Sequence, residues 1–439
     1  QDNHDVKILD LEALRDVIEK HIVDIKEFAP DIIGVFGTSP IHKYIKESIR
    51  VLNEICPLST IIVGGPHATF FPEDLLNSEV KIDYVFRGEA ENSILEFVNQ
   101  LKLYNKVVDQ DKIPGIAYKI EKDCFVDSNI PRIKDLDSVP MPAYNLLPLE
   151  RYFEAGSSEK TITMMTSRGC PNQCIYCAEP VLYGKKFRSR SAANVVDEMR
   201  YLRDQYKIDH VVFYDSTFNH DKDRVKQICK QIIKESIGIT WRARVRADKL
   251  DQEMVELMKL SGCEELSLGV ETGSERILTI LKKNETKEEI KNAFELIREQ
   301  NLWCSGYFMF GIPGETVSDM QETIDFAIEL NPDWALFSAA TPFPGTELFD
   351  MVEKDLINTD LGNYKFNFNK SIISYDKISN EQIDYYINLA YEKFYLRKEW
   401  LINRLQKAEH TKQVDNIINS YNFYNERKKS LPSPPAYLQ

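Results

Sequence analysis

Short apolar runs alternate with longer stretches of helical periodicity over most of this 439-residue chain. In its first part, apolar runs at 6–9, 31–36, 60–63 and 84–86 are separated by helical patterns at 11–28 and 41–55. Strands that alternate with helices predict a parallel sheet covered on both faces, whose ligands bind outside the carboxyl ends of the strands. We therefore expect a Rossmann-like α/β domain at 1–110.

The same rhythm returns between residues 161 and 348. Six strands are predicted, at 161–166, 210–214, 240–245, 265–269, 304–310 and 334–339. The helical patterns around them lie at 192–206, 221–234, 251–260, 287–300 and 317–330. A βα series of this kind predicts a barrel-like sheet, whose chemistry takes place at the carboxyl ends of its strands.

Two further segments do not follow this rhythm. Residues 111–160 contain Pro114, Pro131, Pro140, Pro142 and Pro148, and are expected to be an extended linker. Residues 349–439 are rich in aromatic side chains and contain a long helical pattern from 380 to 405. We expect a helical C-terminal cap that packs on the second domain. Its aromatic residues belong to that packing, or alternatively help to shape a substrate site.

Three clustered cysteines supply the candidate chemistry. Cys170, Cys174 and Cys177 form a CxxxCxxC loop directly after the first strand of the second domain. Thiolates select iron–sulfur clusters or zinc, and a cubane cluster held by protein alone needs four of them, so three indicate an iron left open for another ligand. Zinc is the alternative, but its sites usually combine CxxC pairs with two further ligands.

This loop resembles that of the radical SAM enzymes, in which S-adenosylmethionine chelates the open iron of a [4Fe–4S] cluster. The resemblance implies a partial (β/α)6 TIM-type barrel, open on one side. It also implies that Tyr176, just before the third cysteine, packs near the adenine.

The same resemblance assigns the ends of the next strands. Asp215 and Ser216 are expected at the methionine end of S-adenosylmethionine, where a carboxylate would pair with the amino group. Arg242 and Arg244 share one face of their strand because strand side chains repeat every two residues. Either can reach the methionine carboxylate or a substrate anion, and a pair with no such role is an equal alternative.

The last two strands complete the expected set of contacts. Glu271 is expected to contact the ribose or the amino group of S-adenosylmethionine. The backbone around Phe308 and Gly311 is expected to flank the adenine.

The N-terminal half resembles the cobalamin-binding domain found before many radical SAM cores, which carries the phrases GGPH and RGE after successive strands. The expected contacts are Thr38, Ser39, Gly64, Gly65, Pro66, His67, Gly88 and Glu89. The first strand of that family's fold is not evident, and no Asp-x-His-x-x-Gly signature is present, so we expect no histidine below the cobalt. The alternative is that these glycines make tight turns and that His67 is a bonded loop histidine.

The composition of the chain limits the kinds of partner and the location that we expect. The formal net charge is −14, which gives no overall attraction to nucleic acid or anionic lipid. No apolar run approaches the ~20 residues that span a bilayer. Eight cysteines, three of them clustered, indicate metal ligation in a reducing compartment, so we expect a cytoplasmic protein. The expected partners are a small-molecule or peptide substrate and an electron donor such as flavodoxin or ferredoxin.

The expected activity is that of a cobalamin-dependent radical SAM enzyme. It would generate a 5′-deoxyadenosyl radical that attacks an unactivated C–H bond, with C-methylation as the first hypothesis. The alternatives are a cyclase or rearrangement enzyme with or without cobalamin, a tRNA methylthiotransferase, and a non-enzymatic cobalamin or iron–sulfur sensor. The methylthiotransferases carry three more N-terminal cluster cysteines, whereas only Cys56 and Cys124 lie in that region here.

Overall fold

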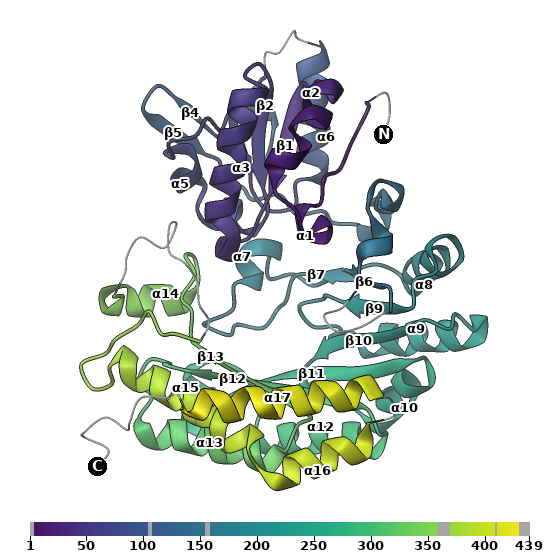
Figure 1. Ribbon diagram of the computed structural model, residues 1–439, viewed down its shortest axis with the longest axis vertical. Helices are drawn as coiled ribbons and strands as arrows, with labels where there is room; N and C mark the ends of the chain where they lie inside the picture. The colour runs from purple at the N-terminus through teal and green to yellow at the C-terminus, as the bar shows by residue number, and fades with distance from the viewer. Residues whose placement is uncertain (1–3, 104–107, 154–158, 358–368, 409–410, 430–439) are drawn as a thin grey trace. The chain divides into compact units, whose positions relative to one another are not determined.

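The computed structural model describes residues 4–103, 108–153, 159–357, 369–408 and 411–429, and the chain divides into two compact units. The first unit contains the described residues up to 151 together with 178–186. The second contains the described residues of 152–177, 187–357 and 369–429. Each unit is built around its own main sheet (Figure 1).

The first unit has a five-stranded sheet in the order β1-β2-β3-β4-β5. Its strands are β1 (Ile32–Phe36), β2 (Thr60–Gly64), β3 (Tyr84–Phe86), β4 (Ile116–Ile120) and β5 (Asp123–Val126), of which the first three are parallel. Its main helices are α1 (Leu11–Leu14), α2 (Ile22–Phe28), α3 (His42–Ile55), α4 (Pro66–Phe70), α5 (Pro72–Leu76), α6 (Glu91–Leu103) and α7 (Glu179–Tyr183).

The central strand β2 explains why this sheet is covered on both faces. Ile61 and Val63 belong to one core together with Ile49 of α3, while Ile62 belongs to a second core with Phe97 of α6. Alternate residues of a strand point to opposite faces, so a run of apolar residues requires a helix on each side. The predicted α/β fold of this domain is confirmed.

Two details of the first unit differ from prediction. The helical pattern at 11–28 is broken into α1, a 3₁₀ turn (Ile18–His21) and α2, because Arg15 takes a left-handed conformation with φ of 52°. The apolar run at 6–9 forms no strand, and β1 pairs with β2 alone among the described residues.

The segment expected to be a linker contributes two strands to this sheet. β4 pairs antiparallel with β3, and β5 pairs antiparallel with β4 across a turn made by Glu121 and Lys122. Two-residue hairpin turns usually carry Asn or Gly where φ is positive, but here Glu121 has φ of 53°. The turn therefore lacks the residues by which a hairpin is recognised in a sequence.

The second unit has a six-stranded parallel sheet in the order β13-β12-β11-β10-β9-β6. Its strands are β6 (Thr161–Met164), β9 (His210–Phe213), β10 (Thr240–Val245), β11 (Cys263–Glu271), β12 (Trp303–Phe310) and β13 (Trp334–Ala339). The alternating helices are α8 (Ala192–Tyr201), α9 (Lys222–Glu235), α10 (Gln252–Leu260), α11 (Glu275–Ile280), α12 (Lys287–Glu299) and α13 (Val317–Leu330). A short antiparallel pair, β7 (Ser167–Arg168) and β8 (Arg188–Ser189), follows β6. All six predicted strands are present, and the sheet is open because β6 and β13 are its two edges.

The alternation along β10 shows how this sheet separates its core from its cavity. Trp241, Ala243 and Val245 are buried, whereas Arg242 and Arg244 lie on the opposite face and are partly exposed. The helices cover one face of the sheet (Figure 1), and the other face is left for polar side chains.

The C-terminal part of the chain is also helical, as expected. They are α14 (Glu347–Val352), α15 (Asn380–Tyr395), α16 (Lys398–Lys407) and α17 (Thr411–Lys429). The helix predicted from 380 to 405 is interrupted, because α15 ends at Tyr395 and α16 begins at Lys398. None of the helices in the described ranges is both long and apolar enough to cross a membrane.

Candidate active site

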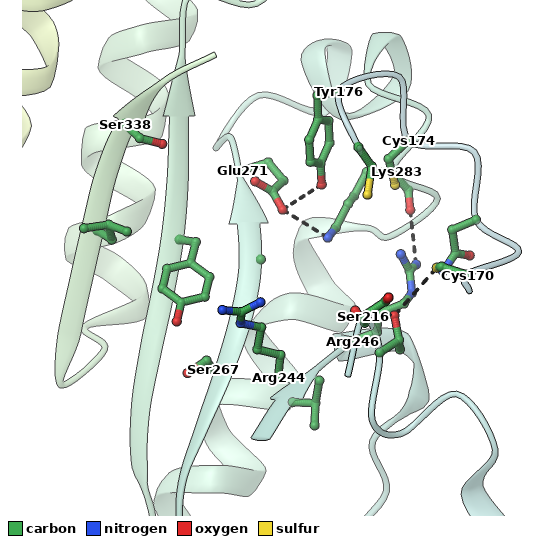
Figure 2. Close-up of a pocket in the computed structure, with 17 residues that line it drawn as sticks. Cys170, Cys174, Tyr176, Ser216, Arg244, Arg246, Ser267, Glu271, Lys283 and Ser338 are labelled. Carbon is green, nitrogen blue, oxygen red and sulfur yellow. Dashed lines mark hydrogen bonds and ion pairs between the residues drawn. The ribbon is translucent and has the colours of Figure 1, made fainter. Parts of the chain in front are cut away.

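A cavity of about 480 Å³ lies at the carboxyl ends of the second unit's strands (Figure 2). The cysteine loop lines it, together with the ends of β10, β11, β12 and β13 and the loop that follows β9. Ligand cavities in proteins are commonly of this size, and barrel enzymes place their chemistry at this end of the sheet.

All three cysteines of the loop line this cavity. Cys170 is buried, Cys174 and Cys177 are partly exposed, and none of the three forms a disulfide bond. The loop is tied to the rest of the unit by a hydrogen bond from the Ile175 amide to the Leu281 carbonyl, at 3.1 Å. Asn172 adds a hydrogen bond from its side-chain amide to the Cys170 Sγ, at 3.2 Å.

This donor set fits a cubane cluster better than a single zinc ion. Within the described part of the chain, no three His, Cys, Asp or Glu side chains converge as ligands of one metal ion. A tetrahedral zinc site requires such convergence, whereas a cubane presents its irons at separate corners and each thiolate binds a different one. Three thiols that line one cavity fit the ligands of three irons of such a cluster.

Tyr176, Glu271 and Lys283 form a hydrogen-bonded group in the cavity (Figure 2). The Tyr176 hydroxyl donates to Glu271 Oε1 at 2.7 Å, and the Lys283 ammonium donates to the same oxygen at 3.3 Å. Burial raises the pKa of Tyr176 well above its usual value, and the Glu271 carboxylate adds to this effect. The group ties the cysteine loop to the end of β11.

The backbone at the end of β11 directs Glu271 into this group. The pairing of β11 with β12 shifts register between Gly269 and Glu271, and Glu271 has a positive φ of 68°. Left-handed backbone is uncommon for a residue with a side chain, and Glu271 adopts it at the point where the register shifts. Glu271 was expected to line the site, and it does.

Two cations act on the Cys174 thiol. Burial raises the pKa of Cys174, while the charges of Lys283 and Arg246 lower it. Burial lowers the pKa of Lys283, but the negative charges of Glu271 and Glu285 raise it by more, so the net effect is a raised pKa. Lys283 therefore stays protonated beside the cysteine loop.

Asp215 does not line the cavity, contrary to expectation. It is fully buried, and its carboxylate accepts hydrogen bonds from the amide and the hydroxyl of both Thr166 and Ser167, at 2.5–3.1 Å. Four donors use the lone pairs of a carboxylate, so Asp215 holds the start of the cysteine loop and is not available to an amino group. Ser216, the next residue, lines the cavity as expected.

The two arginines of β10 share a face, as predicted, but only one lines the cavity. The Arg244 guanidinium lies over the Tyr214 ring, 4.2 Å from its centroid, and borders the cavity. Arg242 lies 4.0 Å from the Glu265 carboxylate and is not among the lining residues.

Phe308 and Gly311 are not lining residues either. The Phe308 side chain is buried and stacks on Phe337, 5.1 Å between ring centroids, because it points to the helix-covered face of β12. Tyr307, one residue earlier, points to the cavity instead. Gly311 is packed against Ile383, which a Cβ would meet at 3.0 Å.

In the first unit, the ends of β1 and β2 are formed by Thr38, Gly64 and Gly65. All three are partly exposed, and the 71% exposed ring of Phe36 stands beside them at the end of β1. A side chain at Gly65 would meet the Gly37 carbonyl at 2.8 Å, and φ there is 99°, so this position requires glycine. Pro66 occupies the first turn of α4.

His67 and Ser39 are buried rather than presented to a ligand. His67 is 1% exposed, and its Nδ1 lies 3.1 Å from the Ser39 Oγ. Burial lowers the pKa of His67, partly offset by Asp74. The structure therefore supports the interpretation of His67 as a bonded histidine, although it lies in α4 and not in a loop.

Gly88 and Glu89 are covered by the first unit's own chain. A Cβ at Gly88 would meet Ile130 at 2.3 Å, and the Glu89 carboxylate accepts a hydrogen bond from the Ile133 amide at 3.0 Å. These residues hold the segment 130–133 in place, which accounts for the RGE phrase without a ligand.

Several lining residues were not predicted, chiefly Lys283, Arg246, Tyr307 and Ser267. Lys283 lies in the loop between α11 and α12, where a basic residue is ordinarily taken for a solvent-exposed one. Nothing in the local sequence indicates that Lys283 lines the site. It lies twelve residues after Glu271, and the two side chains meet only because the loop folds back on the end of β11.

Two family models match the chain: the radical SAM superfamily over residues 164–327 and the B12 binding domain over residues 1–98. The chain is also 32% identical to an uncharacterized methyltransferase of Pyrococcus horikoshii over 403 residues, 92% of this chain and 86% of the relative.

More distant relatives have named activities. The cytidylyl-2-hydroxyethylphosphonate methyltransferase of Streptomyces wedmorensis is 27% identical, over 80% of this chain and 72% of the relative. The anaerobic magnesium-protoporphyrin IX monomethyl ester cyclase of Rubrivivax gelatinosus is 26% identical, over 88% of this chain and 69% of the relative.

Two solved structures share the fold. The radical S-adenosylmethionine methyltransferase TsrM from Kitasatospora setae matches with a TM-score of 0.70 at 21% identity, over 80% of this chain and 71% of that one. The cobalamin-dependent S-adenosylmethionine radical enzyme OxsB matches with a TM-score of 0.74 at 18% identity, over 96% of this chain and 66% of that one. The expected family and cofactors are thus confirmed. The chain belongs to the radical SAM enzymes that carry an N-terminal B12-binding domain, and its cofactors are a [4Fe–4S] cluster, S-adenosylmethionine and cobalamin.

Proposed function

We propose that this enzyme is a C-methyltransferase that acts on an unactivated carbon of a small-molecule substrate. The observation that carries the proposal is the meeting of three cysteine side chains, Glu271 and Lys283 in one cavity at the strand ends. The named methyltransferases among its relatives support methyl transfer as the outcome.

The thiols of Cys170, Cys174 and Cys177 would hold the cluster. Glu271 is suited to the amino group of S-adenosylmethionine, because its carboxylate lines the cavity and both of its hydrogen bonds from described residues go to Oε1. Arg244 supplies a cation for a carboxylate, either that of the methionine moiety or that of a substrate.

When bound, the cluster supplies the electron that cleaves S-adenosylmethionine, and cobalamin carries a methyl group. The chain's own contribution is to hold the reacting groups in the right orientation and to exclude water from the cavity. The loop bond to Leu281 and the Tyr176–Glu271 bond fix the thiols that would hold the cluster relative to the strand ends.

For cobalamin, the fitting residues are Thr38, Gly64 and Gly65 at the exposed strand ends of the first unit. Glycine allows a ligand close to the backbone, and a threonine hydroxyl can donate to it. His67 is buried and bonded to Ser39, so it is unsuited to bind the cobalt from below.

The test is anaerobic purification with cobalamin, reconstitution of the cluster, and measurement of 5′-deoxyadenosine and S-adenosylhomocysteine after reduction. Formation of both products is expected for methyl transfer. Cys174→Ala should abolish both, and Cys124→Ala, at a partly exposed cysteine of β5, should retain both. Turnover that survives in Cys174→Ala would contradict the proposal.

A cyclase is the second candidate, since relatives at 26% identity are named magnesium-protoporphyrin cyclases. Formation of 5′-deoxyadenosine without S-adenosylhomocysteine would favour it. Either activity requires a low-potential electron donor such as flavodoxin or ferredoxin, and with the clustered thiols this supports a cytoplasmic location.

A further inference from the structure

A chain of alternating charges runs along the cysteine side of the cavity. Lys283 lies 3.3 Å from Glu271 and 3.2 Å from Glu285, and Arg246 lies 3.5 Å from Glu285 and 2.8 Å from Asp248. Backbone bonds hold this order, because Arg246 donates to the Lys283 carbonyl at 3.1 Å and the Ala247 amide donates to Glu285 at 2.8 Å. The charges therefore keep fixed positions.

Nearly all of these charges are out of solvent. The side chains of Lys283 and Arg246 are each 7% exposed, and that of Glu285 is 0% exposed. Solvent and salt screen buried charges much less than surface charges, so each acts on its neighbours over a longer range. Lys283 and Arg246 line the same cavity as Cys174, so their charges lie beside the residues that would hold the cluster.

We propose that Lys283 is a positioning and tuning residue, whose buried positive charge raises the reduction potential of the cluster held by Cys174. This inference depends on the proposed role of the three cysteines as cluster ligands. Its physical basis is that the potential of an iron–sulfur cluster follows the net charge and hydrogen bonding around its ligands.

The sign follows from electrostatics. Reduction adds one negative charge to the cluster, and a fixed cation beside a ligand stabilises the reduced form. Glu285 opposes this effect, because it places a negative charge 3.2 Å from the Lys283 ammonium. Removing the lysine charge and removing the glutamate charge must therefore move the potential in opposite directions.

Lys282 provides a matched control. It is the neighbouring lysine, but it is 45% exposed, pairs with Glu347 at 2.6 Å and does not line the cavity. Lys282→Gln removes the same charge from the same loop without changing the buried chain of charges.

The experiment is a redox titration of the reconstituted cluster, followed by electron paramagnetic resonance in the absence of S-adenosylmethionine and cobalamin. The variants are Lys283→Gln, Lys283→Arg, Glu285→Gln and Lys282→Gln, with iron content and circular dichroism recorded for each. We expect a more negative midpoint for Lys283→Gln and a more positive one for Glu285→Gln. Lys283→Arg and Lys282→Gln should stay near the wild-type midpoint.

Shifts of the same sign in Lys283→Gln and Glu285→Gln, or no shift in either, would overturn the inference. If Lys283→Gln fails to fold, an unchanged potential in Glu285→Gln overturns it and a positive shift supports it. A wild-type protein that takes up no [4Fe–4S] cluster would instead contradict the proposed function, so the two failures are distinguishable.

Discussion

At the scale of single residues, Asp215 has a different role from the one its position in the sequence implied. Its carboxylate collects four donors from Thr166 and Ser167, the two residues that lead from β6 into the cysteine loop. Hydrogen bonds to a buried charge are among the strongest in proteins, and each is worth about 1.5–3 kcal/mol. Asp215 fixes where the cysteine loop starts.

We predict that Asp215→Asn lowers the stability of the apo protein by about 2 kcal/mol and reduces the iron bound per chain. The asparagine has one acceptor oxygen and turns an NH₂ group toward donors that the carboxylate satisfied. Thermal unfolding and iron analysis measure the two effects. Asp223→Asn, an exposed change in the first turn of α9, is the control, and equal behaviour of the two variants would contradict the prediction.

Glu315 is a second buried carboxyl outside the cavity, in the loop after β12. It is 6% exposed and accepts hydrogen bonds from the Gly311 and Ile312 amides at 2.6 and 3.2 Å. Burial raises the pKa of Glu315 to about 8, with a further contribution from Asp319. The folded chain therefore retains a proton here at pH values where the unfolded chain has lost it.

This raised pKa predicts a pH dependence of stability. Between the ordinary pKa of 4.5 and about 8, the folded state binds more protons, so stability falls as pH rises, by at most about 1.4 kcal/mol per pH unit. Glu315→Gln cannot ionise and should lose this dependence. Melting temperatures at pH 5 and pH 8 provide the measurement, and the variant should gain relative to wild type at pH 8. A constant difference at both pH values would contradict the assignment.

At the scale of elements, helix α15 provides hydrogen-bond partners for the backbone at one edge of the second unit's sheet. β13 has no strand on its outer side among the described residues, and two tyrosine hydroxyls of α15 bind its backbone instead. The Ala335 amide donates to the Tyr395 hydroxyl at 3.0 Å, and that hydroxyl donates to the Ala335 carbonyl at 2.9 Å. The Phe337 amide donates to Tyr391 at 3.2 Å. Unpaired strand edges promote aggregation, and the two tyrosine hydroxyls protect the edge of β13 by bonding to its backbone.

Tyr395→Phe should therefore destabilise the protein by about 1–3 kcal/mol, because it leaves the buried Ala335 amide and carbonyl without a partner. Tyr385→Phe, at a half-buried position of the same helix, should change stability much less. Denaturant unfolding and a concentration-dependent light-scattering assay measure stability and association. Equal stability of the two variants would show that water replaces the hydroxyl.

At the scale of the whole molecule, each unit has a core that does not depend on the cysteine loop. Within the described residues, the cores of the first unit comprise residues from 11 to 126, and the sheet of the second unit is fully paired without the loop residues 170–177. This differs from small zinc domains, whose folding energy comes from the metal.

Removal of the cluster by an iron chelator should therefore leave the far-ultraviolet circular dichroism nearly unchanged. A modest fall in melting temperature is expected, because a ligand that binds only the folded state stabilises it. The apo protein should regain its absorbance on reconstitution. Loss of most helical signal on chelation would contradict this view of the cores.

The sequence by itself determined the order of the six strands of the second unit, the position of the cysteine loop and the family, but not the strands β4 and β5. These features depend on local periodicity and on residues close together in the chain. It placed Cys170, Cys174, Cys177 and Glu271 in the site, because they lie at the end of a strand or in the loop that follows one, and strand ends of a parallel sheet meet at one edge.

Only the tertiary structure decided which strand-end side chains face the cavity. Phe308 and Tyr307 are neighbours, yet one packs under the helices and the other lines the site, because a strand alternates its faces. Asp215 has the right position but its acceptors are already occupied, and Lys283 reaches the site from a loop that carries no local signal. Such outcomes depend on contacts between residues far apart in the chain, and local patterns contain no information about how those contacts are satisfied.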